Sequence, residues 1–145
     1  MSKGRMVLTI VVAVVVSEIL GGVVHGFVLS GDYAPFYGQL LRSQPGIPML
    51  LLPVAHLSAV AALVWIFGRL ELKGGTAAQG VTLGLIGFFA GQAPLWLIWY
   101  AEQPWPVSLV VKQLALELVS SLIIGMTIVA VSGRRNAQAR VPSAV

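Results

Sequence analysis

The sequence contains no cysteine and few charged residues. None of its 145 residues is Cys, and only 10% are Asp, Glu, Lys or Arg. Without thiols, disulfides, thiol catalysis and Cys-ligated metals are excluded, and with them the quinone-coupled thiol oxidoreductases, one class of four-helix membrane enzyme. A soluble domain carries about 25% charged residues. The shortage of charge therefore argues against a soluble fold.

Three signatures of catalysis are also missing from the sequence. It has no nucleophile motif, no His-x-x-x-His or Glu-x-x-His spacing for a metal, and no Gly-rich loop for a nucleotide. These absences count against an enzyme, which stays an alternative. The first expectation is a binding, transport or accessory protein.

What the chain has in abundance is apolar residues. They make up 57% of the sequence, and the mean hydropathy is +0.90. Four apolar runs fill most of the chain: residues 6–30, 48–70, 79–101 and 107–131. At 1.5 Å per residue each is long enough to cross about 30 Å of hydrocarbon. We therefore predict an all-α fold: a four-transmembrane-helix bundle forming a single multi-pass domain over residues 1–145.

The basic residues indicate the orientation of these four spans. Most of them would lie on one side of the membrane: Lys3, Arg5, Arg69, Lys73, Arg134, Arg135 and Arg140. Arg42 lies in a loop on the other side, and Lys112 lies just inside the last run. The positive-inside rule then places both termini in the cytoplasm, N-in/C-in. The net charge of +4 follows from these flanks, so we expect contact with the lipid bilayer and no nucleic-acid partner.

The first apolar run begins after basic residues, as a signal peptide does. Its length, residues 6–30, exceeds the apolar core of about 7–15 residues in a signal peptide. No Ala-x-Ala cleavage site follows it, and it contains a central Glu18. We therefore expect this segment to stay in the protein as a span.

Glycines at helical spacing predict close helix packing. Three small-residue pairs recur at four-residue spacing: Gly22 and Gly26, Gly80 and Gly84, and Gly87 and Gly91. Such pairs let helix backbones approach closely in lipid. We expect them to pack the bundle. The alternative is that a pair left outside the bundle joins copies into a homo-oligomer or a larger membrane complex.

Two prolines inside the runs and two in a connection shape the expected helices. Pro53 and Pro94 each remove a backbone donor and are expected to kink the second and third spans. Pro104 and Pro106 make the connection between the third and fourth runs short and stiff. Those two helices are therefore expected to be antiparallel neighbours.

A few polar residues interrupt the apolar runs. Glu18 and His25 are seven residues apart and Gln113 and Glu117 four apart, so each pair shares a helix face. Under the predicted orientation, the polar residues all lie between the midplane and the outer third of the membrane. The candidates for one polar pocket that binds a ligand or a proton are Glu18, His25, His56, Gln92, Gln113 and Glu117. Each carboxylate placed in the hydrocarbon costs about 2.5–3.5 kcal/mol on insertion scales.

The polar residues allow three interpretations. Glu18 has no Lys or Arg at its depth, so we expect it to be neutral or to share a proton with His25 or His56. The pocket would then bind a proton, an ion or a small molecule. A second interpretation is a structural clasp that sets helix register. In the third, His25 and His56 ligate a metal or haem iron in a redox subunit or membrane-embedded enzyme. No cofactor is predicted.

The segment that follows the first run carries a resemblance. Residues Tyr33–Gln39 read Tyr-Ala-Pro-Phe-Tyr-Gly-Gln. This resembles the Tyr-x-Pro-Leu/Phe-Phe-Gly-Lys motif in an uncharacterised (domain-of-unknown-function) family of small bacterial four-helix integral membrane proteins. The order of spans and the proline-containing third connection are also similar. The resemblance implies a bacterial inner (plasma) membrane and four spans, and it brings no activity and no functional residue.

Overall fold

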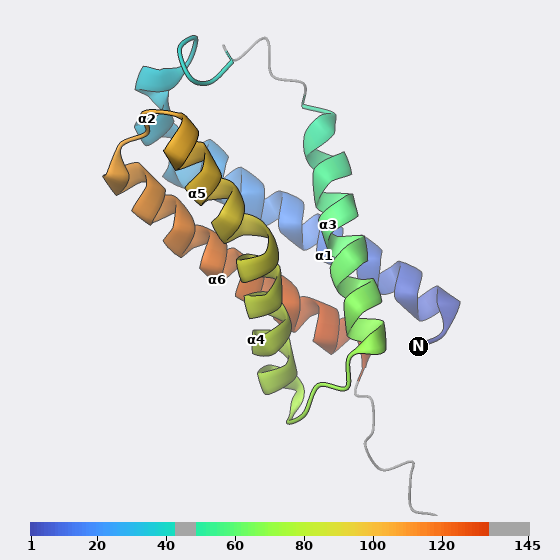
Figure 1. Ribbon diagram of the computed structural model, residues 1–145. Coiled ribbons are helices and arrows are strands. Elements are labelled where there is room, and N and C mark those ends of the chain that lie inside the picture. Colours follow the sequence, from blue (N-terminus) through green and yellow to red (C-terminus); the bar gives the residue numbers. More distant parts are fainter. Residues whose placement is uncertain (43–48, 134–145) are drawn as a thin grey trace, which may run out of the picture.

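The computed structural model describes residues 1–42 and 49–133, and over these residues the chain is helical with no strand (Figure 1). The long elements are α1 (Lys3–Val23) with the π-helical η1 (Val24–Val28), α3 (Leu51–Arg69), α4 (Thr76–Gly87) with the π-helical η4 (Phe88–Gln92), α5 (Ala93–Glu102) and α6 (Val107–Ser132). Two short turns follow η1: α2 (Ser30–Tyr33) and the 3₁₀ turn η2 (Ala34–Phe36). The all-α prediction is confirmed for these residues.

Four helical segments are long and apolar enough to cross a membrane. They are Lys3–Val28, Leu51–Arg69, Thr76–Glu102 and Val107–Ser132. Each differs from the predicted run by a few residues at its ends; residues 43–48, where the second run was expected to begin, lie outside the described part. Large apolar side chains such as Phe27, Leu50 and Phe89 are exposed on the surface. Such a surface suits a lipid environment.

Helix α6 occupies the centre of the bundle. It packs along α4 on one side and along α1 on another, while α3 packs mainly against α1. α3 stands away from α5 at the end where α3 begins (Figure 1). Two buried apolar clusters hold the two ends together. One contains Ala13, Val64 and Ile128, and the other contains Val24 and Leu109. The polar residues of α1 and α6 lie between the two clusters.

The contact between α4 and α6 is made through glycine. A Cβ atom added at Gly84 would lie 2.6 Å from the carbonyl oxygen of Ser121, and one at Gly80 would lie 2.7 Å from the Cα atom of Met126. Both distances are shorter than any real Cβ contact, so only glycine allows this approach. Gly125 of α6 completes the contact from the other side, although it belongs to none of the glycine pairs in the sequence.

The other predicted glycine pairs are placed differently. A Cβ atom at Gly87 would lie 3.2 Å from the side chain of Leu63, a tight contact with α3. At Gly22, Gly26 and Gly91, a Cβ atom would meet nothing within 4 Å among the described residues. These three glycines therefore do not pack the bundle as expected. The face of α1 and η1 that carries Gly22 and Gly26 is open among the described residues.

The prolines act at helix starts and at a π-helical segment. Pro53 is the third residue of α3, in the first turn, where its missing N–H costs no hydrogen bond. The expected kink inside the second span is therefore wrong at this position. Pro94 follows η4, whose ladder closes with the N–H of Ala93 bonded to the carbonyl of Phe88. Pro94 has no N–H to donate to the preceding turn. The third span accommodates this proline through the widened hydrogen-bond ladder of η4.

The N-terminus and the C-terminal ends of α3 and α6 lie at one end of the bundle. Arg5 lies against Gly133, and Thr9 shares a hydrogen bond of 3.4 Å with Ser132. Lys3, Arg5, Arg69 and Lys73 are at this end, and Lys112 is near the other, where it binds Asp32. These four basic residues share the end that the predicted N-in/C-in orientation places in the cytoplasm. Arg134, Arg135 and Arg140 lie outside the described residues, and the orientation stays a prediction.

Because the sequence contains no cysteine, single introduced cysteines can test this orientation directly. A single cysteine replacing Lys73, in the connection between α3 and α4, should be protected from an impermeant thiol reagent in intact cells. A cysteine replacing Pro104, in the connection between α5 and α6, should react. Both sites should react once the membrane is permeabilised. The reverse pattern in intact cells would show that the orientation is opposite.

Candidate functional site

Two histidine–glutamate pairs link helices in the middle of the bundle. The Nδ1 atom of His56 on α3 lies 2.8 Å from Oε1 of Glu18 on α1. The Nε2 atom of His25 in η1 lies 3.2 Å from Oε1 of Glu117 on α6. Glu18 was expected to pair with His25 or His56, and in the structure its partner is His56. His25 is bonded to α6, although its seven-residue spacing from Glu18 predicted a shared face.

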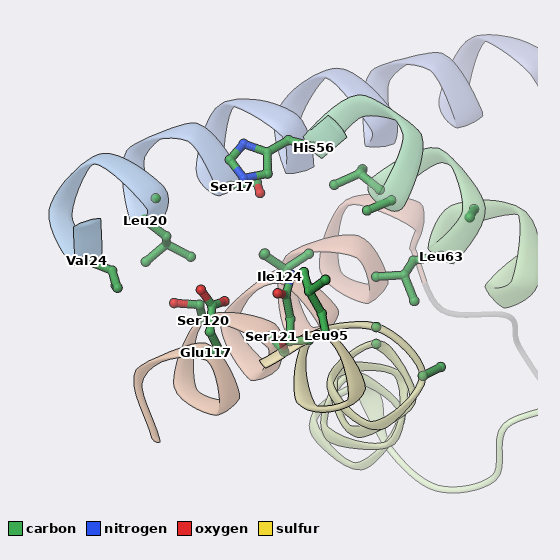
Figure 2. A pocket seen from close by; sticks show the side chains of 18 of the residues that line it. Ser17, Leu20, Val24, His56, Leu63, Leu95, Glu117, Ser120, Ser121 and Ile124 are labelled. Carbon is green, nitrogen blue, oxygen red and sulfur yellow. The ribbon is translucent and has the colours of Figure 1, made fainter. Parts of the chain in front are cut away.

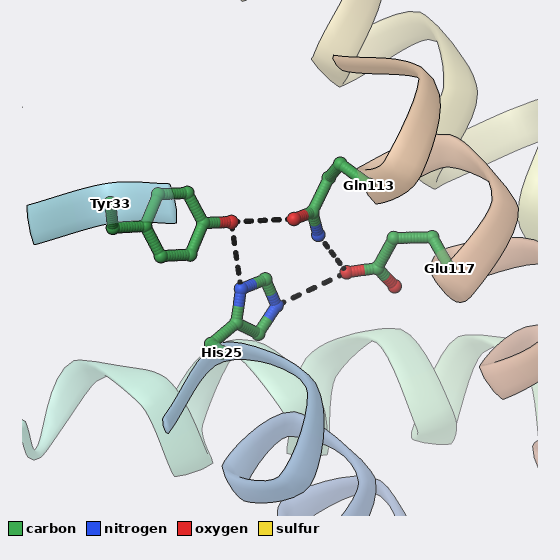
Figure 3. A network of polar contacts seen from close by, with 4 residues as sticks. All are labelled: His25, Tyr33, Gln113 and Glu117. Carbon is green, nitrogen blue, oxygen red and sulfur yellow. Dashed lines mark hydrogen bonds and ion pairs between the residues drawn. The ribbon is translucent and has the colours of Figure 1, made fainter. Parts of the chain in front are cut away.

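His25 and Glu117 belong to a closed ring of four side chains (Figure 3). The hydroxyl of Tyr33 donates to Oε1 of Gln113, and Nε2 of Gln113 donates to Oε1 of Glu117 at 2.8 Å. Nδ1 of His25 lies 3.1 Å from the Tyr33 hydroxyl and closes the ring. Gln113 is fully buried. Tyr33 joins from α2, a short turn beyond the first span, where helical spacing no longer applies.

The directions of two hydrogen bonds follow from the chemistry of Tyr33 and Gln113. Burial, and after it the negative charge of Glu117, raises the pKa of Tyr33 above its usual value, so the phenol keeps its proton. The hydroxyl uses its single proton in the hydrogen bond to Gln113. The Tyr33 oxygen therefore accepts the N–H of His25 Nδ1. His25 Nε2 and Glu117 Oε1 make the remaining contact of the ring, at 3.2 Å.

The pair of His56 and Glu18 is not enclosed in this way. Only Nδ1 of His56 has a partner among the described residues, and the Glu18 side chain is 37% exposed. The imidazole lies against α1 at Gly21, where a Cβ atom would approach His56 Cε1 to 3.2 Å. With a proton on Nδ1, the imidazole of His56 donates to the carboxylate of Glu18, and its Nε2 is left free.

A cavity of about 450 Å³ lies beside both pairs, between α3 and the η4–α5 segment (Figure 2). Most of its wall is apolar, with Leu20, Val24, Leu63 and Ile124 among the lining residues. Its size lies within the range of about 300–1,000 Å³ usual for ligand sites. The polar residues that line it are Ser17, His25, His56, Gln92, Glu117, Ser120 and Ser121.

The serines of the cavity have no hydrogen-bond partner among the described residues. Ser17 is 6% and Ser120 8% exposed, and both side chains appear with Ser121 in the view of the cavity (Figure 2). In contrast, Thr82 and Ser58 donate to a carbonyl one turn earlier in their helices. The cavity serines are therefore free to bond with a molecule inside it. Ser17 was missed from the sequence, although its spacing of four residues to Gly21 places both on one face.

The remaining predicted residues have different places. Gln92 lines the cavity without joining either pair, Gln113 belongs to the ring, and Glu18 is behind His56. The described residues contain no group of three or more His, Cys, Asp or Glu that could hold a metal ion. Both nitrogens of His25 are used by Tyr33 and Glu117, so the residue could ligate haem iron only if the ring opened.

Comparison of the chain with protein-family models, with curated proteins and with solved structures finds no match.

Proposed function

We propose that this chain is a four-span, N-in/C-in protein of the bacterial inner membrane that binds a small amphiphilic molecule in the cavity between α3 and α5. It would act as a binding, carrier or accessory protein. The observation that carries the proposal is the set of unpartnered polar groups in an otherwise apolar cavity near the middle of the spans: Ser17, Ser120, Ser121, Gln92 and the Nε2 atom of His56.

Polar groups without partners are costly at this depth. The serine hydroxyls line the cavity, and lipid tails would offer them no hydrogen bond. A ligand with a polar head and an apolar body would satisfy both parts of the cavity. The head would bond to the serines, and the body would pack against side chains such as Leu63 and Ile124.

The position of the cavity supports entry from the bilayer. Leu52 of α3 and Leu95 of α5 line it from opposite sides, and each is 45% exposed. Helix α3 diverges from α5 on this side (Figure 1). A mouth between exposed leucines opens toward hydrocarbon, where an amphiphile is already concentrated.

A structural clasp is the second candidate, and the closed ring favours it. The ring joins α6 to η1 and α2, and the His56–Glu18 pair joins α3 to α1. A clasp explains the two pairs. It does not explain the unpartnered serines, which bridge no helices.

Binding can be tested with bromoundecanol, whose bromine quenches tryptophan fluorescence, because Trp96 and Trp99 line the cavity. For the protein in phosphatidylcholine nanodiscs, we expect saturable quenching. Replacing both Ser17 and Ser120 with alanine should weaken binding about tenfold, since two hydrogen bonds contribute about 0.5–1.5 kcal/mol each. Ser58→Ala is the matched control, because the Ser58 hydroxyl is already bonded to the carbonyl of Val54.

The control should bind bromoundecanol as the unsubstituted protein does. Quenching that rises linearly, without saturation, in all these proteins would mean that the alcohol only dissolves in the bilayer. That result would refute the ligand site and leave the clasp.

A further inference from the structure

We infer that a second site, at the end of the bundle where α1 begins, binds the phosphate group of an anionic membrane lipid. The site is a pocket of about 330 Å³ between the start of α1 and the ends of α3 and α6. Its lining includes Ser2, Arg5, Phe67, Gly68, Ser132 and Gly133. It shares no lining residue with the cavity between α3 and α5, so the inference is independent of the proposed function.

The pocket lies where lipid headgroups are expected. One apolar span, Lys3–Val28, begins beside it, and two others, Leu51–Arg69 and Val107–Ser132, end beside it. The guanidinium of Arg69 lies 3.7 Å from the centroid of the Trp65 ring. Tryptophan is enriched at the boundary between hydrocarbon and headgroups, and arginine flanks spans there. In a bilayer, lipid phosphates would therefore lie beside this pocket.

Arg5 supplies a positive charge without a counterion in the pocket. Its guanidinium makes no ion pair with a described residue, in contrast to Lys112, which binds Asp32 at 2.8 Å. None of the residues that line the pocket is Asp or Glu. A guanidinium is planar and can donate two parallel N–H bonds to one phosphate group, which makes arginine suited to this ligand.

The structure places this guanidinium at the end of α6. A Cβ atom at Gly133 would lie 2.9 Å from Arg5 Cζ, so glycine gives the guanidinium room, and the φ of +75° at Gly133 also favours glycine. About one turn further into the bundle, Thr9 and Ser132 share a hydrogen bond of 3.4 Å. This bond ties the start of α1 to the end of α6, which are two walls of the pocket.

Ser2 and Phe67 complete a surface for a lipid. The Oγ atom of Ser2 accepts the backbone N–H of Arg5 at 3.3 Å, so its own proton remains for a ligand. Phe67 gives the pocket an apolar wall, against which the glycerol and the first carbons of a lipid chain can pack. Inorganic phosphate would use the donors without the wall, whereas a lipid uses both. We therefore assign the phosphate group to a lipid.

Native mass spectrometry of the protein, titrated with lipid in a nonionic detergent, tests the site. Phosphatidylglycerol and phosphatidylcholine with the same dioleoyl chains are compared, and inorganic phosphate serves as a competitor. Phosphatidylcholine carries its own ammonium group, which offsets the charge of its phosphate. We expect one phosphatidylglycerol to bind at least about tenfold more tightly than phosphatidylcholine. Inorganic phosphate should displace it only at far higher concentration.

Three variants locate the site. Arg5→Gln removes the guanidinium and should lower the affinity for phosphatidylglycerol at least about tenfold. Arg5→Lys keeps the charge without the two parallel donors, so its affinity should lie between those of Arg5→Gln and the unsubstituted protein. Lys3→Gln is the matched control, because it removes one positive charge two residues away from a side chain that does not line the pocket. The control should bind phosphatidylglycerol normally.

Each contrary result has a distinct meaning. Equal losses in Arg5→Gln and Lys3→Gln would overturn the site, because they would reflect general attraction by basic residues. Equal affinities of inorganic phosphate and phosphatidylglycerol would overturn the assignment to a lipid. If Arg5→Gln does not fold, normal lipid affinity in Arg5→Lys would still refute the guanidinium contact. Quenching by bromoundecanol should be unchanged in Arg5→Lys, so failure at this site leaves the proposed function standing.

Discussion

Replacing Gly125 with leucine should prevent the bundle from assembling. A Cβ atom at this position would overlap the carbonyl oxygen of Gly80 and lie 2.8 Å from the Cα atom of Gly84. These are backbone atoms of α4, so no side chain can move to make room. The substitution would force α4 away from α6 along the most extensive helix contact of the structure. We expect the free energy of unfolding to fall by more than the ~1–3 kcal/mol usual for an overpacked core.

Gly22→Leu is the matched control for this result. It makes the same substitution near the end of α1, at a position where a Cβ atom meets nothing within 4 Å among the described residues. We expect normal yield, elution volume and thermal stability in mild detergent for Gly22→Leu, and aggregation or loss of protein for Gly125→Leu. A monodisperse Gly125→Leu protein of normal stability would contradict the close approach of α4 and α6. If Gly22→Leu alters the elution volume, a second chain covers the open face of α1.

Glu117→Leu should cause the second large effect, through the hydrogen-bonded ring. The substitution removes the acceptor of Gln113 Nε2 and the partner of His25 Nε2. Gln113 is fully buried, whereas the His25 side chain is 42% exposed, so only Gln113 carries the full cost and we expect a loss of about 1–3 kcal/mol in the free energy of unfolding. Equilibrium unfolding in mixed detergent micelles, followed by circular dichroism, measures this loss.

Two variants control for the change of residue type. Glu102→Leu removes an exposed carboxylate at the end of α5 and should change the free energy of unfolding by no more than about 0.5 kcal/mol. Glu117→Gln keeps an acceptor for Gln113, so its effect should fall between those of the two leucine variants. Equal effects of Glu117→Leu and Glu102→Leu would mean that the ring does not stabilise the fold.

The chain's helices and their apolar character could be predicted from its sequence. Apolar runs long enough to span a bilayer and basic residues at their flanks are local features of composition. In a membrane every backbone polar group must be bonded within its own segment, so such runs predict helices without knowledge of their neighbours. The ends of the helical segments differ from the predicted ends by a few residues, because caps and turns are set by local contacts. Pro53, for example, starts a helix and does not kink one.

The site could be predicted only as a set of residues. Helical periodicity placed Glu18 and His25 on one face of the first span, but it cannot say which helix lies opposite each of them. The structure brings His56 to Glu18 and Glu117 to His25, because α3 and α6 pack on different sides of α1. Tyr33 enters the ring from a turn beyond the span, where no periodic pattern applies.

Among the glycines, the same motif led to opposite outcomes. Gly22–Gly26 and Gly80–Gly84 have identical spacing, yet only the second pair is in a helix contact. Small residues permit close approach, while the crossing of α4 and α6 decides where it occurs, and that crossing places Gly125 against Gly84. The cavity and the free hydroxyl of Ser17 also arise from tertiary structure, because they depend on α3 diverging from α5. The sequence by itself therefore determined helical segments and their polar residues, whereas only the packing of the helices decided which groups are paired, enclosed or left free.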